Sequence, residues 1–177
     1  MSQAEQAKHW IKLDDELVRQ AFSLVVSPGR IEVLHRDPTL IVDAAHNPHG
    51  ARALVKTLRE EFDFESIFGV VAILGDKDVD GLLRELEPVI DRLVVTQSHS
   101  ERAMPVDQLF EIAINIFGDH RVYKEPSLQN ALSQSIEQCT LVNQSSEGVS
   151  GVVVTGSVVT AGEARVLLNR LKNFETE

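Results

Sequence analysis

The chain has 177 residues, the size of one ordinary domain, and a chain of this length can bury most of its apolar surface without disulfides. Its 27 acidic and 17 basic residues give a net charge of −10, which repels phosphate backbones and leaves no basic stripe for a nucleic acid or an anionic membrane. The single cysteine, Cys139, excludes a disulfide framework and suits a reducing compartment. We expect a cytoplasmic domain that binds no nucleic acid and no membrane, although a few placed cations and backbone amides suffice for a small anion such as ATP.

The first 27 residues are predicted to belong to a different unit from the rest. Residues 14–25 place apolar side chains at helical spacing, and that helix has little preceding chain against which to pack. Pro28 and Gly29 follow, a pair that is typical of a boundary. We therefore expect residues 1–27 to be a linker and a helix left from a preceding central domain, and residues 28–177 to form one domain.

From Pro28 onward, short apolar runs alternate with helical periodicity. The runs predict six strands, at 31–35, 40–42, 68–74, 93–96, 121–123 and 152–155. Apolar faces predict five helices, four of them beginning near residues 48, 82, 106 and 128 and a last one that includes residues 166–171. Asn47 with Pro48, and also Ser127, are typical helix-start residues. Residues 143–150 are expected to be a flexible surface loop.

Buried strands separated by helices predict a Rossmann-like α/β fold. We expect a mostly parallel six-stranded sheet with helices on both faces and one antiparallel edge strand. The first strand is the candidate for that edge, because only a short turn at Asp37-Pro38 joins it to the second. In such sheets ligands bind beyond the carboxyl ends of the strands, so residues just after each strand are the first candidates for a site.

The segment after the second strand has the strongest site pattern. Asp43, His46 and Asn47 lead into a helix whose free amides and dipole favour an anion. Asp43 is expected to be an exposed carboxylate that accepts hydrogen bonds from ribose hydroxyls, and His46 to donate to a phosphate. Two other interpretations stay open at this point. Asp43 and Asn47 could merely cap the helix, or Asp43, His46 and His49 could bind a metal because they recur every third residue.

Polar groups also follow three later strands. Lys77 lies between two carboxylates, a pattern that, taken alone, a turn followed by a helix start explains better than a site does. Residues 96–102 include His99, and Ser157 follows the last strand. Together these strand ends predict a site for a small anionic ligand. The patterns Gly-x-Gly-x-x-Gly and Gly-x-x-x-x-Gly-Lys-Ser/Thr are both absent from the sequence, so we expect the domain to contribute to a nucleotide site rather than to hold a triphosphate alone.

The string Pro28-Gly29-Arg30, followed by LIVDAAHNPH at residues 40–49, closely resembles the signature of folylpolyglutamate and dihydrofolate synthases, which belong to the Mur ligase superfamily. Ala44 stands where these proteins usually carry glycine. The resemblance continues, in order and at matching spacing, through residues 76–78, 98–103 and 154–157. It departs at Val158-Val159, where the family often has an aliphatic residue followed by tyrosine, so the aromatic contact made there by relatives is not expected.

The resemblance implies the C-terminal domain of an ATP-dependent ligase that adds L-glutamate to dihydropteroate, to folate polyglutamates or to both, through an acyl-phosphate intermediate. The implied partner is a central P-loop ATPase domain, which carries the phosphate loop and the Mg²⁺ ligands, so no metal site is expected in this chain. By position, the resemblance assigns Arg30, Asp43, His46 and Asn47 to ATP. It assigns Lys77, His99 and Ser157 to glutamate.

Three other functions are compatible with the residues. The chain could belong to another Mur-type ligase, such as a peptidoglycan-precursor or cyanophycin synthetase, although the residues after Asp43 favour the folate branch. It could be a nucleotide-binding module without catalysis, in which case no P-loop domain would accompany it. It could be a zinc hydrolase, in which case purified protein would contain stoichiometric metal.

Overall fold

The computed structural model describes residues 30–174, so the expected helix at 14–25 and the expected boundary after residue 27 lie outside the described residues. The strands are β1 (Glu32–Arg36), β2 (Thr39–Val42), β3 (Phe64–Val71), β4 (Arg92–Gln97), β5 (Val122–Ser127) and β6 (Val149–Thr155). The helices are α2 (Pro48–Glu61), α3 (Val79–Leu86), α4 (Val106–Phe117), α5 (Leu128–Ser145) and α6 (Val158–Phe174), with a short 3₁₀ turn, η1 (Asp119–Arg121).

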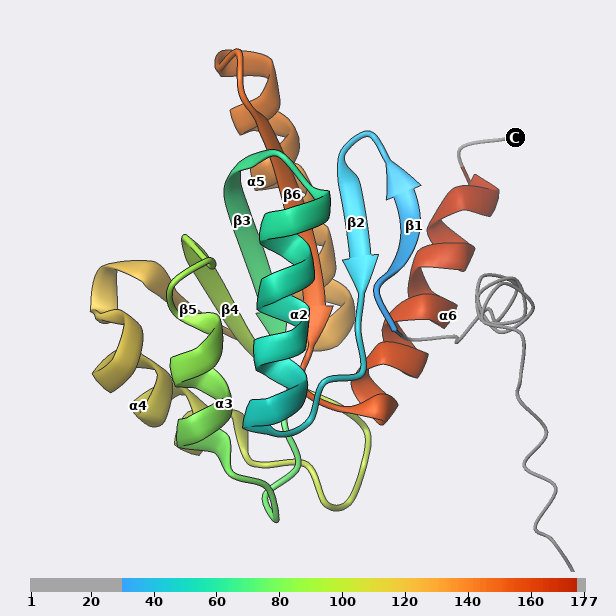
Figure 1. Cartoon of the computed structure of the whole chain (residues 1–177). Coiled ribbons are helices and arrows are strands. Elements are labelled where there is room, and N and C mark those ends of the chain that lie inside the picture. Colours follow the sequence, from blue (N-terminus) through green and yellow to red (C-terminus); the bar gives the residue numbers. More distant parts are fainter. Residues whose placement is uncertain (1–29, 175–177) are drawn as a thin grey trace, which may run out of the picture.

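The six strands form one sheet in the order β1-β2-β6-β3-β4-β5 (Figure 1). β1 pairs antiparallel with β2 at one edge, and every other pairing is parallel. The predicted fold class, including the antiparallel first strand, is therefore confirmed.

Helices cover both faces of the sheet. In β2, Ile41 packs with α2, α3 and α4 in one buried cluster, while its neighbour Val42 packs with α5 and α6 in the other. Figure 1 shows the same division, with α2, α3 and α4 in front of the sheet and α5 behind it. Successive strand residues point to opposite faces, so a sheet with two apolar faces needs helices on both. Within the described part of the chain, no helix is both long and apolar enough to cross a bilayer.

The expected helix starts are present. Asn47 accepts a hydrogen bond from Gly50 N (2.8 Å) through Oδ1, and Pro48 is the first residue of α2. Ser127 accepts from Asn130 N (3.3 Å) and opens α5. These caps satisfy amides that a helix leaves free at its first turn, which is why short polar side chains and proline mark the starts in the sequence.

Several predicted boundaries are wrong, among them the starts of the third and sixth strands, which lie at Phe64 and Val149. The third strand ends at Val71 rather than at residue 74, because Ala72, Ile73 and Leu74 are buried but leave the sheet to meet the segment at 102–104. The fifth strand begins after Arg121, which lies in η1, and continues to Ser127. The expected loop at 143–150 is mostly regular structure, since α5 runs to residue 145 and β6 begins at 149.

The turn between β6 and α6 depends on Gly156. Its φ of 112° is a conformation that other residues rarely adopt, and a Cβ at this position would lie 2.6 Å from the carbonyl oxygen of Ala72. Its amide donates to the carbonyl oxygen of Ala45 (3.1 Å). Gly156 thus lets the loops after β2, β3 and β6 approach one another closely.

We predict that Gly156→Ala lowers the free energy of unfolding by about 1–3 kcal/mol, because it adds both backbone strain and a steric clash. Gly162→Ala is the matched control, since Gly162 lies within α6 and a Cβ added there would meet no neighbouring segment within 4 Å. That control should be neutral or stabilising by up to about 1 kcal/mol. Denaturant unfolding of both variants checks the prediction, and equal changes would contradict it.

Candidate functional site

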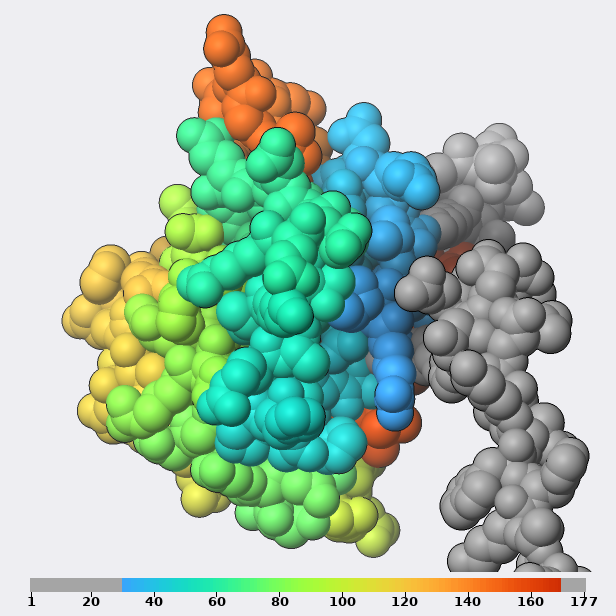
Figure 2. Space-filling model, in the orientation of Figure 1, coloured from blue at the N-terminus to red at the C-terminus, as the bar shows by residue number. Residues whose placement is uncertain are grey.

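The sheet has five mutually parallel strands, whose carboxyl ends all lie along one side of the sheet: β2, β6, β3, β4 and β5. We call this line of strand ends the carboxyl edge. β1 runs in the opposite direction, so Arg30 and Ile31 at its start also lie there. Figures 1 and 2 show the loops after β2, β3 and β4 along the lower side of the molecule, next to the start of α6. The structure therefore brings every predicted site residue to one edge.

The strand order reverses direction at this edge, between β3 and β6. β3 and β6 are neighbours, but β3 leads into α3 on one face and β6 leads into α6 on the other. Such a reversal is where open α/β sheets bind ligands.

Asp43 is buried, so the expectation of an exposed carboxylate is wrong. Its residue surface is 7% exposed, Oδ1 accepts from Ala45 N (2.8 Å) and Oδ2 accepts from Ile31 N (3.0 Å). A short carboxylate reaches the backbone two residues ahead, and this local bond folds the loop over it. Burial raises the pKa of Asp43, while the backbone bonds and the charges of Arg30 and His46 act in the opposite direction.

His46 and Asn47 stand at the N-terminus of the 14-residue helix α2. The Nδ1 atom of His46 lies 2.9 Å from the carbonyl oxygen of Ala44, and since a carbonyl only accepts, Nδ1 carries the proton. The Nε2 atom can then donate to a phosphate only when the imidazole is charged. The Oδ1 atom of Asn47 is used by its cap bond, so the side chain serves the helix start whether or not it also meets a ligand.

Lys77 lies in a small charged cluster after β3. Its Nζ is 3.2 Å from Oδ2 of Asp76, and Arg102, from the loop after β4, places a guanidinium nitrogen 2.6 Å from the same oxygen. Desolvation raises the pKa of Asp76, but the hydrogen bonds from Lys77 and Arg102 outweigh it and hold the pKa below its ordinary value. A backbone bond from Gly75 N to Arg102 O (2.9 Å) joins the two loops. The ion pair between Lys77 and Asp76 is the contact that the surface-turn interpretation of Lys77 expects.

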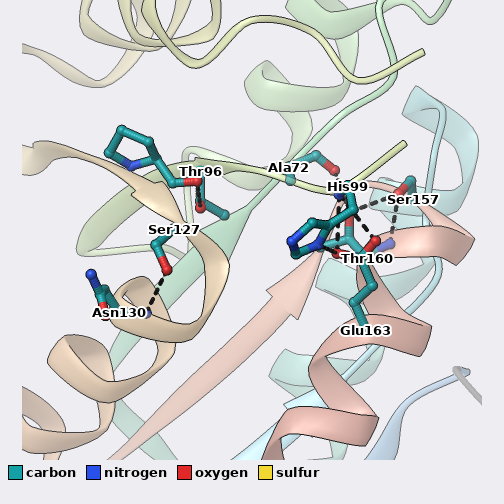
Figure 3. A network of polar contacts seen from close by, with 9 residues as sticks. Ala72, Thr96, His99, Ser127, Asn130, Ser157, Thr160 and Glu163 are labelled. Atoms are coloured by element: carbon teal, nitrogen blue, oxygen red, sulfur yellow. Dashed lines mark hydrogen bonds and ion pairs between the residues drawn. The ribbon is translucent and has the colours of Figure 1, made fainter. Parts of the chain in front are cut away.

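Sequence reasoning missed Glu163, which holds His99. The carboxylate of Glu163, on α6, accepts from the backbone amide of His99 (3.1 Å) and lies 3.2 Å from its Nδ1 (Figure 3). His99 remains exposed, with 89% of its side chain accessible. It also lines a pocket of about 560 Å³ beside the carboxyl edge. No local pattern could have indicated Glu163, because its partner is 64 residues away.

Ser157 is buried and caps α6. Its hydroxyl accepts from Thr160 N (2.9 Å) and lies 2.7 Å from Oγ1 of Thr160, which in turn donates to the carbonyl oxygen of Ala72 (2.9 Å; Figure 3). Only 1% of the residue is exposed. The hydroxyl thus holds the start of α6 against the segment that follows β3, and the expected contact with an amino acid stays a prediction. The spacing from Ser157 to Thr160 is the signal that would have suggested a cap.

The metal alternative has no support in the geometry. Among residues 30–174, no three His, Cys, Asp or Glu side chains are placed to hold an ion, and Asp43, His46 and His49 do not converge.

Comparison with known proteins gives a family. Residues 29–158 match the family model described as "Mur ligase, glutamate ligase domain". A dihydrofolate synthase/folylpolyglutamate synthase from Mycobacterium tuberculosis is 46% identical over 165 residues, which cover 90% of this chain and 34% of that protein. A dihydrofolate synthetase from Saccharomyces cerevisiae is 30% identical over 157 residues, covering 82% of this chain and 36% of that protein.

Solved structures agree with the sequence comparison. The M. tuberculosis folylpolyglutamate synthase, complexed with ADP and AMPPCP, has a TM-score of 0.84 at 46% identity, covering 90% of this chain and 36% of that one. A Yersinia pestis folylpolyglutamate synthase/dihydrofolate synthase, complexed with AMPPNP and Mn, has a TM-score of 0.70 at 29% identity, covering 89% and 35%. The chain spans about a third of the length of these relatives. Because the family model covers most of the chain and the fold agrees, the chain belongs to the glutamate ligase domain family of the Mur ligases.

Proposed function

We propose that this chain is the C-terminal domain of an ATP-dependent ligase that joins L-glutamate to dihydropteroate, to folate polyglutamates or to both. The observation that carries the proposal is the position of Arg30, His46 and the N-terminus of α2 at one edge of the sheet, in a chain that is 46% identical to a synthase of this kind. A helix N-terminus with adjacent cations is suited to a phosphate group.

The proposed reaction has two steps. The folate or pteroate carboxylate attacks the γ-phosphorus of ATP and releases ADP, and the acyl phosphate is then attacked by the amine of glutamate, which releases phosphate. Such steps depend on positioning and on groups that offset developing charge. Arg30, Asp43, His46 and Asn47 are the proposed ATP-site residues of this domain.

Lys77 and His99 are the proposed glutamate contacts. They leave two different strand ends of the same edge, one as a cation and one as an exposed imidazole that Glu163 holds in place. Ser157 enters the proposal as a positioning residue, because its buried hydroxyl holds the start of α6, the helix that carries Glu163. Mg²⁺ would be held mainly by the central domain, where it would offset phosphate charge.

We predict that the 177-residue chain alone releases no phosphate from ATP with folate and glutamate present. It lacks a glycine-rich phosphate loop, the element whose backbone amides hold the phosphates in P-loop enzymes. A phosphate-release assay checks this, with the complete ligase as the positive control. Phosphate release by the chain alone would contradict the proposal that a central domain supplies the phosphate loop and the Mg²⁺ ligands.

Asp43→Ala should raise the KM for ATP by about tenfold or more in the complete ligase, since charge-assisted hydrogen bonds contribute about 1.5–3 kcal/mol. It should also lower stability, because two partly buried amides lose their acceptor at about 1–3 kcal/mol each. Asp78→Ala is the matched control, since Asp78 also accepts a backbone hydrogen bond, from Gly81 N, but at α3. Steady-state kinetics and thermal unfolding test both parts, and an unchanged KM with native melting would refute them.

Lys77→Ala should raise the KM for glutamate far more than the KM for ATP, and Ser157→Ala should do so more weakly. If Lys77 serves only the ion pair with Asp76, removal should change little, because exposed pairs contribute about 0–1 kcal/mol. Arg102→Ala separates the two cases, since Arg102 binds the same Asp76 oxygen. Equal glutamate KM values for Lys77→Ala and Arg102→Ala would favour the structural role and count against the glutamate contact.

A further inference from the structure

A further pocket lies away from the carboxyl edge, on the side of the sheet that α5 covers. Its volume is about 320 Å³, and it lies between the middle of α5 and the amino-terminal halves of β4 and β5. This volume is at the lower end of the range for small-molecule sites and leaves room for a ligand with one or two rings. No predicted site residue lines the pocket, so it is separate from the proposed ATP and glutamate contacts.

The floor of the pocket comes from three neighbouring strands. Phe68 of β3 and Val94 of β4 are buried and belong to the cluster that packs with α5 and α6. Arg92 comes two residues before Val94, and Tyr123 of β5 pairs with Val94, so the alternation of strand side chains puts all four on the same face. Tyr123 is on the edge strand and is 49% exposed, so this side of the pocket is open to solvent.

Ser135 borders the pocket from the helix side. It belongs to the buried stripe of α5, whose other members are apolar: Leu128, Ala131, Leu132 and Cys139. A serine at this position is shorter than the leucines of the stripe and leaves space above the floor. Its residue surface is 2% exposed, and its hydroxyl has no hydrogen-bond partner among the described residues. A buried hydroxyl without a partner is unfavourable, and a ligand in the pocket would supply one.

Arg92 brings a cation to the pocket. Its guanidinium carbon lies 5.7 Å from the centre of the Phe68 ring, a contact that holds the charge over the floor. Within the part of the chain that the structure describes, no ion pair joins Arg92 to a carboxylate. The one carboxylate that lines the pocket is that of Glu137, an exposed residue of α5. The donors of Arg92 are therefore available, and the planar guanidinium is suited to a carboxylate.

We propose that this pocket binds a small aromatic carboxylate, whose ring lies against Phe68 and Val94 and whose acid group pairs with Arg92. The ring matches the apolar floor, one negative charge matches the one cation, and the hydroxyl of Ser135 gains an acceptor. The proposal goes beyond the proposed ligase function and does not depend on it, because it uses no residue of the carboxyl edge.

A titration of the 177-residue chain with 2-naphthoate, followed by amide chemical shifts, tests the proposal. A ligand of this size should bind with a Kd of about 1 mM or below. Saturable shifts should centre on residues 92–94, 123 and 134–138 and should leave residues 43–50 unchanged. The uncharged analogue 2-naphthalenemethanol should bind about fivefold more weakly or worse, because it cannot pair with Arg92. Equal affinity for the two compounds, shifts centred outside the pocket or no saturable binding would overturn the proposal.

Variants separate a contact with Arg92 from a general effect of charge. Arg92→Gln should raise the Kd for 2-naphthoate about fivefold or more. The control Arg84→Gln removes the same charge from α3, on the other face of the sheet, and should leave the Kd unchanged. Glu137→Gln should lower the Kd, because it removes the one negative charge that lines the pocket. Equal effects of Arg92→Gln and Arg84→Gln would overturn the proposal.

Ser135→Leu tests the hollow itself. A leucine there continues the apolar stripe of α5, so it should fill the pocket, abolish binding of 2-naphthoate and keep or raise the melting temperature, since it also removes an unpartnered hydroxyl. Unchanged binding by a folded Ser135→Leu would overturn the proposal. If this variant fails to fold, Arg92→Gln and the uncharged analogue still decide the outcome.

Discussion

The insertion of β6 between β2 and β3 is the constraint on which the rest of the structure depends. β6 pairs in parallel with both neighbours, and its residues Val152, Val153 and Val154 are fully buried. The chain reaches this position only by returning from β5 across the face opposite α2, α3 and α4, which is why α5 and α6 lie there. As a result, the neighbouring strands β3 and β6 send their helices to opposite faces, and such a switch point is where open α/β sheets bind ligands.

Basic side chains gather at the carboxyl edge, although the net charge of the whole chain is −10. Arg30 and His46 lie at this edge with Asp43, while Lys77 and Arg102 both pair with Asp76. The Asp76 carboxylate therefore acts as a counter-ion that keeps two cations near the carboxyl edge. This arrangement explains how an acidic domain can offer a site to an anion, because interactions at a few ångströms outweigh a distant diffuse charge that salt screens.

The sequence predicted the fold class, the antiparallel edge and the helix starts, because periodicity and capping residues report on local backbone requirements. Apolarity alone could not predict where β3 ends, since Ile73 is as buried outside the sheet as Val71 is within it. The candidate site residues were predicted to gather at one edge, and they do. The burial of Asp43 could not be predicted, because its carboxylate accepts from Ile31, 12 residues away in the sequence. The cap at Ser157 could have been predicted, because its partner Thr160 is only three residues away.

Hydrogen–deuterium exchange of the complete ligase, with and without a non-hydrolysable ATP analogue, tests most directly whether the carboxyl edge is the nucleotide site of this domain. Another pocket, of about 370 Å³ and including Arg59 and Glu87, lies at the opposite edge and serves as an internal comparison. If the carboxyl edge is the nucleotide site, the analogue should slow exchange in residues 43–50 and leave residues 59–67 unchanged. Protection confined to residues 59–67, or no change at residues 43–50 at saturating analogue, would contradict this assignment.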